Sequence, residues 1–113
     1  MTGSIDQKHL ELYVGGDDAL RDEILTIFEE QALSLKDRID VAADDEEWRD
    51  VMHAMKGAAR GVGAWAVGDL CEDAEAMVGD VDNKSASRKA AADAINARLE
   101  ETIAAARRLR DRK

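Results

Sequence analysis

The fold class follows from residues 44–63, which read DDEEWRDVMHAMKGAARGVG. Apolar residues recur there at intervals of three and four, the spacing that places side chains on one face of an α-helix. Four acidic residues open the stretch, where they complement the positive end of a helix dipole, and glycines close it. The stretch therefore predicts an amphipathic helix over residues 45–62 that needs other helices to cover its apolar face. That face consists of Trp48, Val51, Met52, Met55, Ala58, Ala59 and Val62.

The same periodicity predicts four more helices, over residues 6–14, 18–43, 64–78 and 85–112. Asp6 is the expected N-cap of the first of them. The 113 residues include no proline and only 4% aromatic residues, a composition that favours long helices over sheets. We therefore expect one all-α domain over residues 1–113, an antiparallel up-down four-helix bundle with a short additional N-terminal helix. The expected inward-facing residues of the other long helices are Leu20, Ile24, Ile27, Phe28, Leu35 and Ile39, then Val67, Leu70, Cys71, Ala74, Met77 and Val78, and finally Ile95, Leu99, Ile103, Ala106 and Leu109.

Charge and cysteine content restrict the expected partners and compartment. The formal net charge of −9 should repel nucleic acid and anionic membranes, although the chain ends in a basic run that includes Arg112 and Lys113. With Cys71 as its one cysteine, the chain can form no intramolecular disulfide. No apolar run approaches the ~20 residues that span a bilayer. We expect a soluble, cytoplasmic monomer that binds proteins or small molecules and neither nucleic acid nor membrane.

One histidine lies on the wrong side of its helix to belong to the core. His53 is opposite the apolar face of the helix predicted over residues 45–62, and Arg49, Lys56, Gly57 and Arg60 share its side. An exposed neutral imidazole offers a ring nitrogen as nucleophile, and a nearby ammonium can screen an incoming phosphoryl group. Glycine within a helix costs about 1 kcal/mol relative to alanine, so Gly57 indicates that another surface must approach the imidazole. The pattern favours His53 as a phosphoryl acceptor, with Lys56 for screening and Gly57 for clearance.

Helix positions bring further residues to this neighbourhood. Glu75, at the edge of an apolar face, could accept a hydrogen bond from the imidazole and so fix its tautomer. Leu33 lies off the apolar stripe of its helix and, with Arg49 and Arg60, is expected to contribute to a partner-docking patch. His9 has no Lys or Gly partner and is expected to be an ordinary surface residue. No Cys and His spacing indicates a metal site.

Residues 53–64, which read HAMKGAARGVGA, resemble the signature of histidine-containing phosphotransfer (HPt) domains. The likeness is specific over residues 53–75, weaker over residues 5–52 and uninformative beyond residue 85. Two positions depart from the family pattern. Ala58 stands where the family often has serine, and Gly68 interrupts the predicted fourth helix. Further elements of the likeness are Leu70-Cys71, Ala74-Glu75, Ile5-Asp6, Gly15-Gly16-Asp17 and Ile27-Phe28.

The resemblance implies that His53 receives a phosphoryl group from an aspartate of a response-regulator receiver domain and passes it to another receiver. A hybrid histidine kinase would be a partner, and the receiver would bring Mg²⁺, so no cofactor is expected. Lys56 would assist, Gly57 would admit the receiver and Glu75 would hold the ring. Because the sequence has no Gly-rich phosphate loop and no second domain, we expect a phosphocarrier without ATP-dependent kinase activity. The start at Met1 and the completeness of the predicted bundle favour a freestanding protein. The alternatives are a domain cut from a larger hybrid kinase and a helical adaptor whose histidine is incidental.

Overall fold

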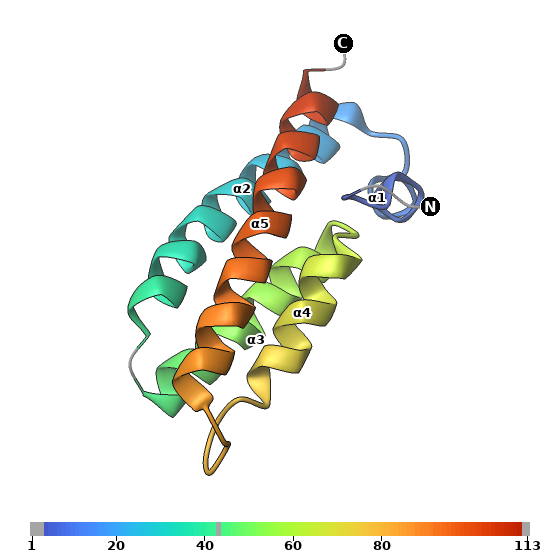
Figure 1. Ribbon diagram of the computed structural model, residues 1–113. Helices are drawn as coiled ribbons and strands as arrows, with labels where there is room; N and C mark the ends of the chain where they lie inside the picture. The colour runs from blue at the N-terminus through green and yellow to red at the C-terminus, as the bar shows by residue number, and fades with distance from the viewer. Residues whose placement is uncertain (1–3, 43, 112–113) are drawn as a thin grey trace.

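The computed structural model describes residues 4–42 and 44–111, which contain five α-helices (Figure 1). The helix over residues 18–41 packs against the helices over residues 45–61 and 84–110, and the helix over residues 65–75 packs against the same two. Successive long helices run in opposite directions, and the first, short helix lies beside one end of the bundle (Figure 1). This arrangement confirms the predicted antiparallel four-helix bundle with a short additional N-terminal helix. The helices are α1 (Gln7–Val14), α2 (Asp18–Val41), α3 (Asp45–Gly61), α4 (Trp65–Glu75) and α5 (Lys84–Arg110).

Aspartate side chains cap the first three helices, each accepting a hydrogen bond from the backbone N–H three residues on. A cap of this kind typically stabilises a helix by about 1 kcal/mol. The prediction of Asp6 as an N-cap is thus confirmed, whereas α4 ends at Glu75, three residues before the predicted Val78. Three residues named in the sequence analysis lie outside the described residues. They are Ala43 and Arg112, the predicted ends of two helices, and Lys113 of the basic run. The cap distances are 3.2 Å from Asp6 to His9, 3.0 Å from Asp17 to Leu20 and 2.8 Å from Asp44 to Glu47.

The core-facing stripe of α2 differs from the prediction. Leu25 and Ala32 are completely buried, whereas Leu20 is 37% exposed and Ile27 is 47% exposed. The buried series occupies positions 25, 28, 32, 35 and 39, and a second apolar face begins one residue earlier, at Ile24. The expectation that Leu20 and Ile27 face inward was therefore wrong, because two neighbouring faces of α2 are apolar and only one contacts the core.

The remaining apolar stripes agree well with the sequence. Every predicted inward residue of α3 is buried except Ala58, which is half-buried, and all five of those in α5 are buried. In α4 and the segment after it, Val67, Cys71 and Ala74 are buried, while Leu70, Met77 and Val78 pack against the core from partly buried positions. No described helix is both long enough and apolar enough to cross a membrane.

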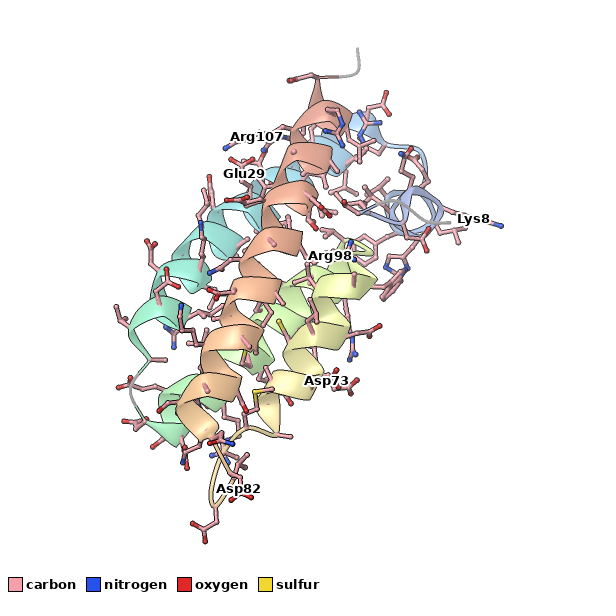
Figure 2. The ribbon with its side chains drawn as sticks, viewed as in Figure 1. Lys8, Glu29, Asp73, Asp82, Arg98 and Arg107 are labelled. Atoms are coloured by element: carbon pink, nitrogen blue, oxygen red, sulfur yellow. The ribbon has the colours of Figure 1, made fainter. Side chains whose placement is uncertain are left out.

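Polar contacts fix how the helices meet. The indole Nε1 of Trp48 in α3 donates a buried hydrogen bond of 2.8 Å to the carbonyl oxygen of Ala74 in α4. At the opposite end of the bundle, Glu29 of α2 pairs with Arg107 of α5 at 2.9 Å and with Arg110 at 2.8 Å. Figure 2 shows Glu29 and Arg107 side by side where α2 and α5 meet. These contacts hold α3 against α4 and α2 against α5.

The loop between α4 and α5 is tied back to the start of α3 by one carboxylate. Asp45 accepts hydrogen bonds from the backbone N–H of Gly79 at 2.8 Å and from the Lys84 ammonium at 3.0 Å. Arg88 donates to the same carboxylate and also lies over the ring of Trp48. The Gly79 hydrogen bond, with the two cations, lowers the pKa of Asp45 to about 2. Asp45 thus keeps its charge over nearly the whole pH range.

Candidate functional site

His53 lies in the middle of α3, on the side turned away from the core. Its side chain is 75% exposed, which confirms that it is not a core histidine. Among the described residues, its Nδ1 is the ring atom with a hydrogen-bond partner, and that partner is Glu75 Oε1 at 3.3 Å. Because Nδ1 faces a carboxylate, Nε2 on the other side of the ring remains available to another molecule.

Glu75 is the last residue of α4, and its Oε1 contacts two groups of α3. Lys56 Nζ lies 2.9 Å from this oxygen, and His53 Nδ1 lies 3.3 Å from it. The Lys56 hydrogen bond holds the pKa of the Glu75 carboxyl below its usual range, and the hydrogen bond with His53 acts in the same direction. An ionised carboxylate can only accept, so the proton of this contact belongs to Nδ1. The arrangement favours the tautomer in which Nε2 carries the lone pair.

The side chain of Lys56 is held by its ion pair with Glu75 and does not extend freely into solvent. Only 17% of its side chain is exposed, and its ammonium lies against the same carboxylate oxygen that contacts His53. The positive charge is therefore held beside the imidazole before any ligand arrives. The sequence predicted Lys56 on the His53 side of α3, and the structure adds that Glu75 brings the two together.

Gly57 lies one turn after His53 and borders open space. A Cβ built on it would meet no atom within 4 Å, so packing inside the protein does not require glycine at this position. Gly57 and Ala58 form the floor of a surface hollow between α2 and α3 that extends in both directions along the two helices. We call this hollow the α2–α3 groove. It is lined by Tyr13, Ile24, Ile27, Phe28, Glu30, Gln31, Ser34, Leu35, Ala54, Gly57, Ala58, Gly61 and Val62.

The three residues expected in a docking patch occupy different surroundings. Arg49 is exposed one turn before His53, and no described residue forms an ion pair with it. The Arg60 guanidinium points to α4, where it lies 3.0 Å from Glu72 and 3.3 Å from Asp69. Leu33 lines a separate groove between α2 and α5, together with residues such as Ile103. None of these three residues is among those that line the α2–α3 groove.

The other reactive side chains lie apart from His53. His9 packs edge-on against Trp65, with ring centroids 4.9 Å apart, and Trp65 donates to the Asp6 carboxylate at 3.0 Å. Cys71 is buried in the core, and this burial raises the pKa of its thiol to about 12. It is therefore an unreactive part of the core. Within residues 4–42 and 44–111, no group of three or more His, Cys, Asp or Glu side chains could hold a metal ion.

The groove residues of α2 were not predicted as part of the site. Ile24, Ile27, Gln31 and Ser34 follow one another at spacings of three, four and three, so they share one face of the helix. This regularity was visible in the sequence, but the isoleucines were assigned to the core. A face that combines exposed isoleucine with polar residues is the signal that could have identified the groove.

Comparison with known proteins agrees with this geometry. A family model described as the Hpt domain matches residues 23–109. The chain is also similar to the crystal structure of the histidine phosphotransferase ShpA from Caulobacter crescentus, with 31% sequence identity and a TM-score of 0.73. That similarity covers 94% of this chain and 89% of the other. No significant match was found among curated proteins. The chain therefore belongs to the Hpt domain family, whose members act in phosphorelays.

Proposed function

We propose that this Hpt domain carries a phosphoryl group on Nε2 of His53, receiving it from the aspartate of one receiver domain and giving it to the aspartate of another. Family membership supports a role in a phosphorelay, and the choice of His53 rests on its surroundings. The single observation that carries the proposal is the 3.3 Å contact between His53 Nδ1 and Glu75 Oε1 on an otherwise exposed imidazole. A ring held at Nδ1 presents Nε2 as a nucleophile.

In the uptake step, the lone pair of Nε2 forms a bond to phosphorus as the bond between phosphorus and the donor aspartate oxygen breaks. The donor leaves as a carboxylate, and the proton on Nδ1 stays in place. Positive charge develops on the imidazole as the new bond forms, and the ionised Glu75 stabilises it through the Nδ1 hydrogen bond. In the delivery step, the carboxylate of the second receiver attacks phosphorus and the bond to Nε2 breaks.

Lys56 would supply positive charge next to the transferred group. Its ammonium has three N–H donors, and Glu75 accepts a hydrogen bond from it at 2.9 Å. The remaining donors can reach phosphoryl oxygens, which carry about two negative charges in total. Mg²⁺ bound by the receiver would share this neutralisation, so the protein needs no cofactor of its own. Lys56 therefore accelerates the transfer without being indispensable to it.

The α2–α3 groove is the surface on which we expect the receiver to dock. It passes beside His53 at Ala54 and Gly57, and Ile27 and Tyr13 give it exposed apolar walls. Burial of these side chains would favour association, and the missing side chain at Gly57 allows a close approach. In this scheme the protein is a cytoplasmic monomer that meets receivers, including one carried by a hybrid histidine kinase.

The proposal is tested by incubating the protein with a receiver domain that carries labelled phosphate on its aspartate. The wild-type protein should take up label that is lost in acid and kept in base, and should pass it to a second, unlabelled receiver. A His53→Gln variant should fold normally, because residue 53 is outside the core, and should take up no label. If the Gln variant is labelled as well, the acceptor is another residue. An adaptor with an incidental histidine would leave both proteins unlabelled with every receiver of the host.

A further inference from the structure

A second group of charged residues joins α3 to α4 close to His53. The Arg60 guanidinium lies 3.0 Å from Glu72 and 3.3 Å from Asp69, both in α4. Its side chain reaches them by crossing α4 at Gly68, where a Cβ would lie 2.8 Å from Arg60 Cγ and 3.0 Å from Nε. Such distances exclude an alanine unless the arginine moves. Glycine destabilises a helix interior, so its presence in α4 is explained by the path it leaves for Arg60.

The contacts of His53 and Arg60 define how α3 and α4 are aligned. His53 contacts Glu75, and Arg60 lies over Gly68. Seven residues separate the first members of these pairs along α3, and seven separate the second members along α4. The two helices are antiparallel. A residue that follows His53 by a given number in α3 therefore lies at the same height along the bundle as the residue that precedes Glu75 by that number in α4.

This alignment places Lys56 level with Glu72. Lys56 comes three residues after His53, and Glu72 comes three residues before Glu75. Glu72 and Glu75 are three residues apart and so are neighbours on the surface of α4, and Lys56 binds the second of them, Glu75, at 2.9 Å. Glu72 is instead bound by Arg60 at 3.0 Å.

We infer that Arg60 is a positioning residue for phosphoryl transfer, because it occupies Glu72 and so leaves Lys56 with Glu75, beside His53. Gly68 belongs to the same arrangement, since it lets the arginine side chain cross α4. The inference rests on the proposed function of His53 and Lys56. It assigns Arg60 to the alignment of the site and not to receiver binding.

Competition for Lys56 is the physical basis of this role. The side chains of Lys56 and Glu75 are 17% and 23% exposed, whereas Glu72 is 59% exposed, so solvent would weaken a pair of Lys56 with Glu72 more than it weakens the pair with Glu75. Without Arg60, Lys56 would divide its time between Glu72 and Glu75. The ammonium would then be beside the imidazole for only part of the time, and Glu75 would lose the charge that keeps its pKa low.

The decisive measurement is an NMR titration of the Glu75 carboxyl in the unphosphorylated protein. Arg60→Met keeps the aliphatic part of the side chain and removes its charge, and it should raise the pKa of Glu75. In a Lys56→Ala background, Arg60→Met should no longer move this pKa. Either of two results would overturn the inference. The first is an unchanged Glu75 pKa in the Arg60→Met variant. The second is a shift of this pKa that persists in the Lys56→Ala background, since it would come directly from the lost arginine charge.

Transfer rates give a second and independent comparison. Arg60→Met should slow phosphoryl uptake by up to about twofold, because Lys56 would still spend at least half of its time at Glu75. Adding Glu72→Gln removes the competing carboxylate, so the double variant should recover the wild-type rate. Gly68→Ala should act like Arg60→Met and be rescued in the same way. If Glu72→Gln alone slows uptake as much as Arg60→Met, the pair is only a clamp between helices and the inference fails.

Arg98→Met is the matched control, because Arg98 is also an arginine paired with a carboxylate, that of Glu101 at 3.4 Å, but lies in α5. It removes the same charge and should leave both the Glu75 pKa and the uptake rate unchanged. Failure of the proposed function would appear differently, as a wild-type protein that takes up no phosphoryl group. The Glu75 titration decides the role of Arg60 in either case.

Discussion

Replacing Gly57 with glutamine should raise the thermal stability of the protein while slowing its reaction with receiver domains. The new Cβ would meet no atom within 4 Å, so the substitution creates no clash inside the protein. Glutamine favours a helix interior over glycine by about 0.5–1 kcal/mol. For a domain of this size that gain corresponds to a rise of about 2–6 °C in Tm. The same side chain would project into the α2–α3 groove one turn from His53 and obstruct the receiver.

Two assays separate the two effects. Thermal unfolding followed by circular dichroism measures the stability gain. Phosphoryl uptake is then measured over a range of phosphorylated-receiver concentrations, and uptake from a small donor such as phosphoramidate is measured in parallel. The glutamine variant should need a higher receiver concentration for half-maximal uptake, because docking is weakened. Its reaction with the small donor should match the wild type, because Nε2 itself is unobstructed.

A second glycine of α3 provides the control. Gly61 also borders open space and lies one turn farther from His53, so Gly61→Gln should disturb receiver uptake less than Gly57→Gln. A Gly57→Gln variant that melts below the wild type would refute the assignment of open space at this position. One that reacts with receivers at the wild-type rate would show that the receiver does not use this groove.

Three further substitutions test the site and its support. Lys56→Ala should slow uptake by about tenfold without abolishing it, because one charge-assisted contact is lost while the receiver's metal remains; a wild-type rate would exclude Lys56 from the reaction. Trp48→Phe should lower the free energy of unfolding by about 0.5–1.5 kcal/mol, since the carbonyl of Ala74 loses its 2.8 Å indole donor and keeps only the backbone N–H of Met77 at 3.0 Å, and an unchanged urea midpoint would contradict this. Asp45→Asn tests pH dependence: folding lowers this pKa to about 2, so the stabilisation is present above the unfolded pKa of about 3.9 and is lost as pH falls toward 2. The Tm difference between wild type and Asp45→Asn should therefore be constant near neutral pH and shrink below about pH 4, and a difference that persists at pH 2 would show that the charge of Asp45 does not act.

The fold could be predicted from the sequence wherever one face of a helix was clearly apolar. The α3 series from Trp48 to Val62 and the α5 series from Ile95 to Leu109 are single stripes, and both contact the core as expected. In α2 two neighbouring stripes are apolar, and periodicity alone cannot say which of them meets the other helices. Leu25 faces the core and Ile27 faces the groove because of how α3 and α5 pack against α2, which is a tertiary effect.

The candidate site was predictable to the extent that it lies on one helix. The spacing of His53, Lys56 and Gly57 placed them on one side of α3, and the structure does the same. Contacts between helices are a different matter. Arg60 also has the spacing of a groove residue, yet its long side chain turns to α4 because Gly68 leaves it room. That choice depends on a neighbour on another helix, which helical periodicity does not contain.

The central claim is that Nε2 of His53 carries the phosphoryl group, and ¹⁵N NMR of the imidazole tests it most directly. The protein, labelled at histidine nitrogens, is phosphorylated by a receiver domain and compared with its unphosphorylated form. The structure predicts that only the His53 ring changes, with phosphorus coupled to Nε2 and the proton kept on Nδ1 beside Glu75. Phosphorus coupled to Nδ1 of His53, or to a ring nitrogen of His9, would contradict the account.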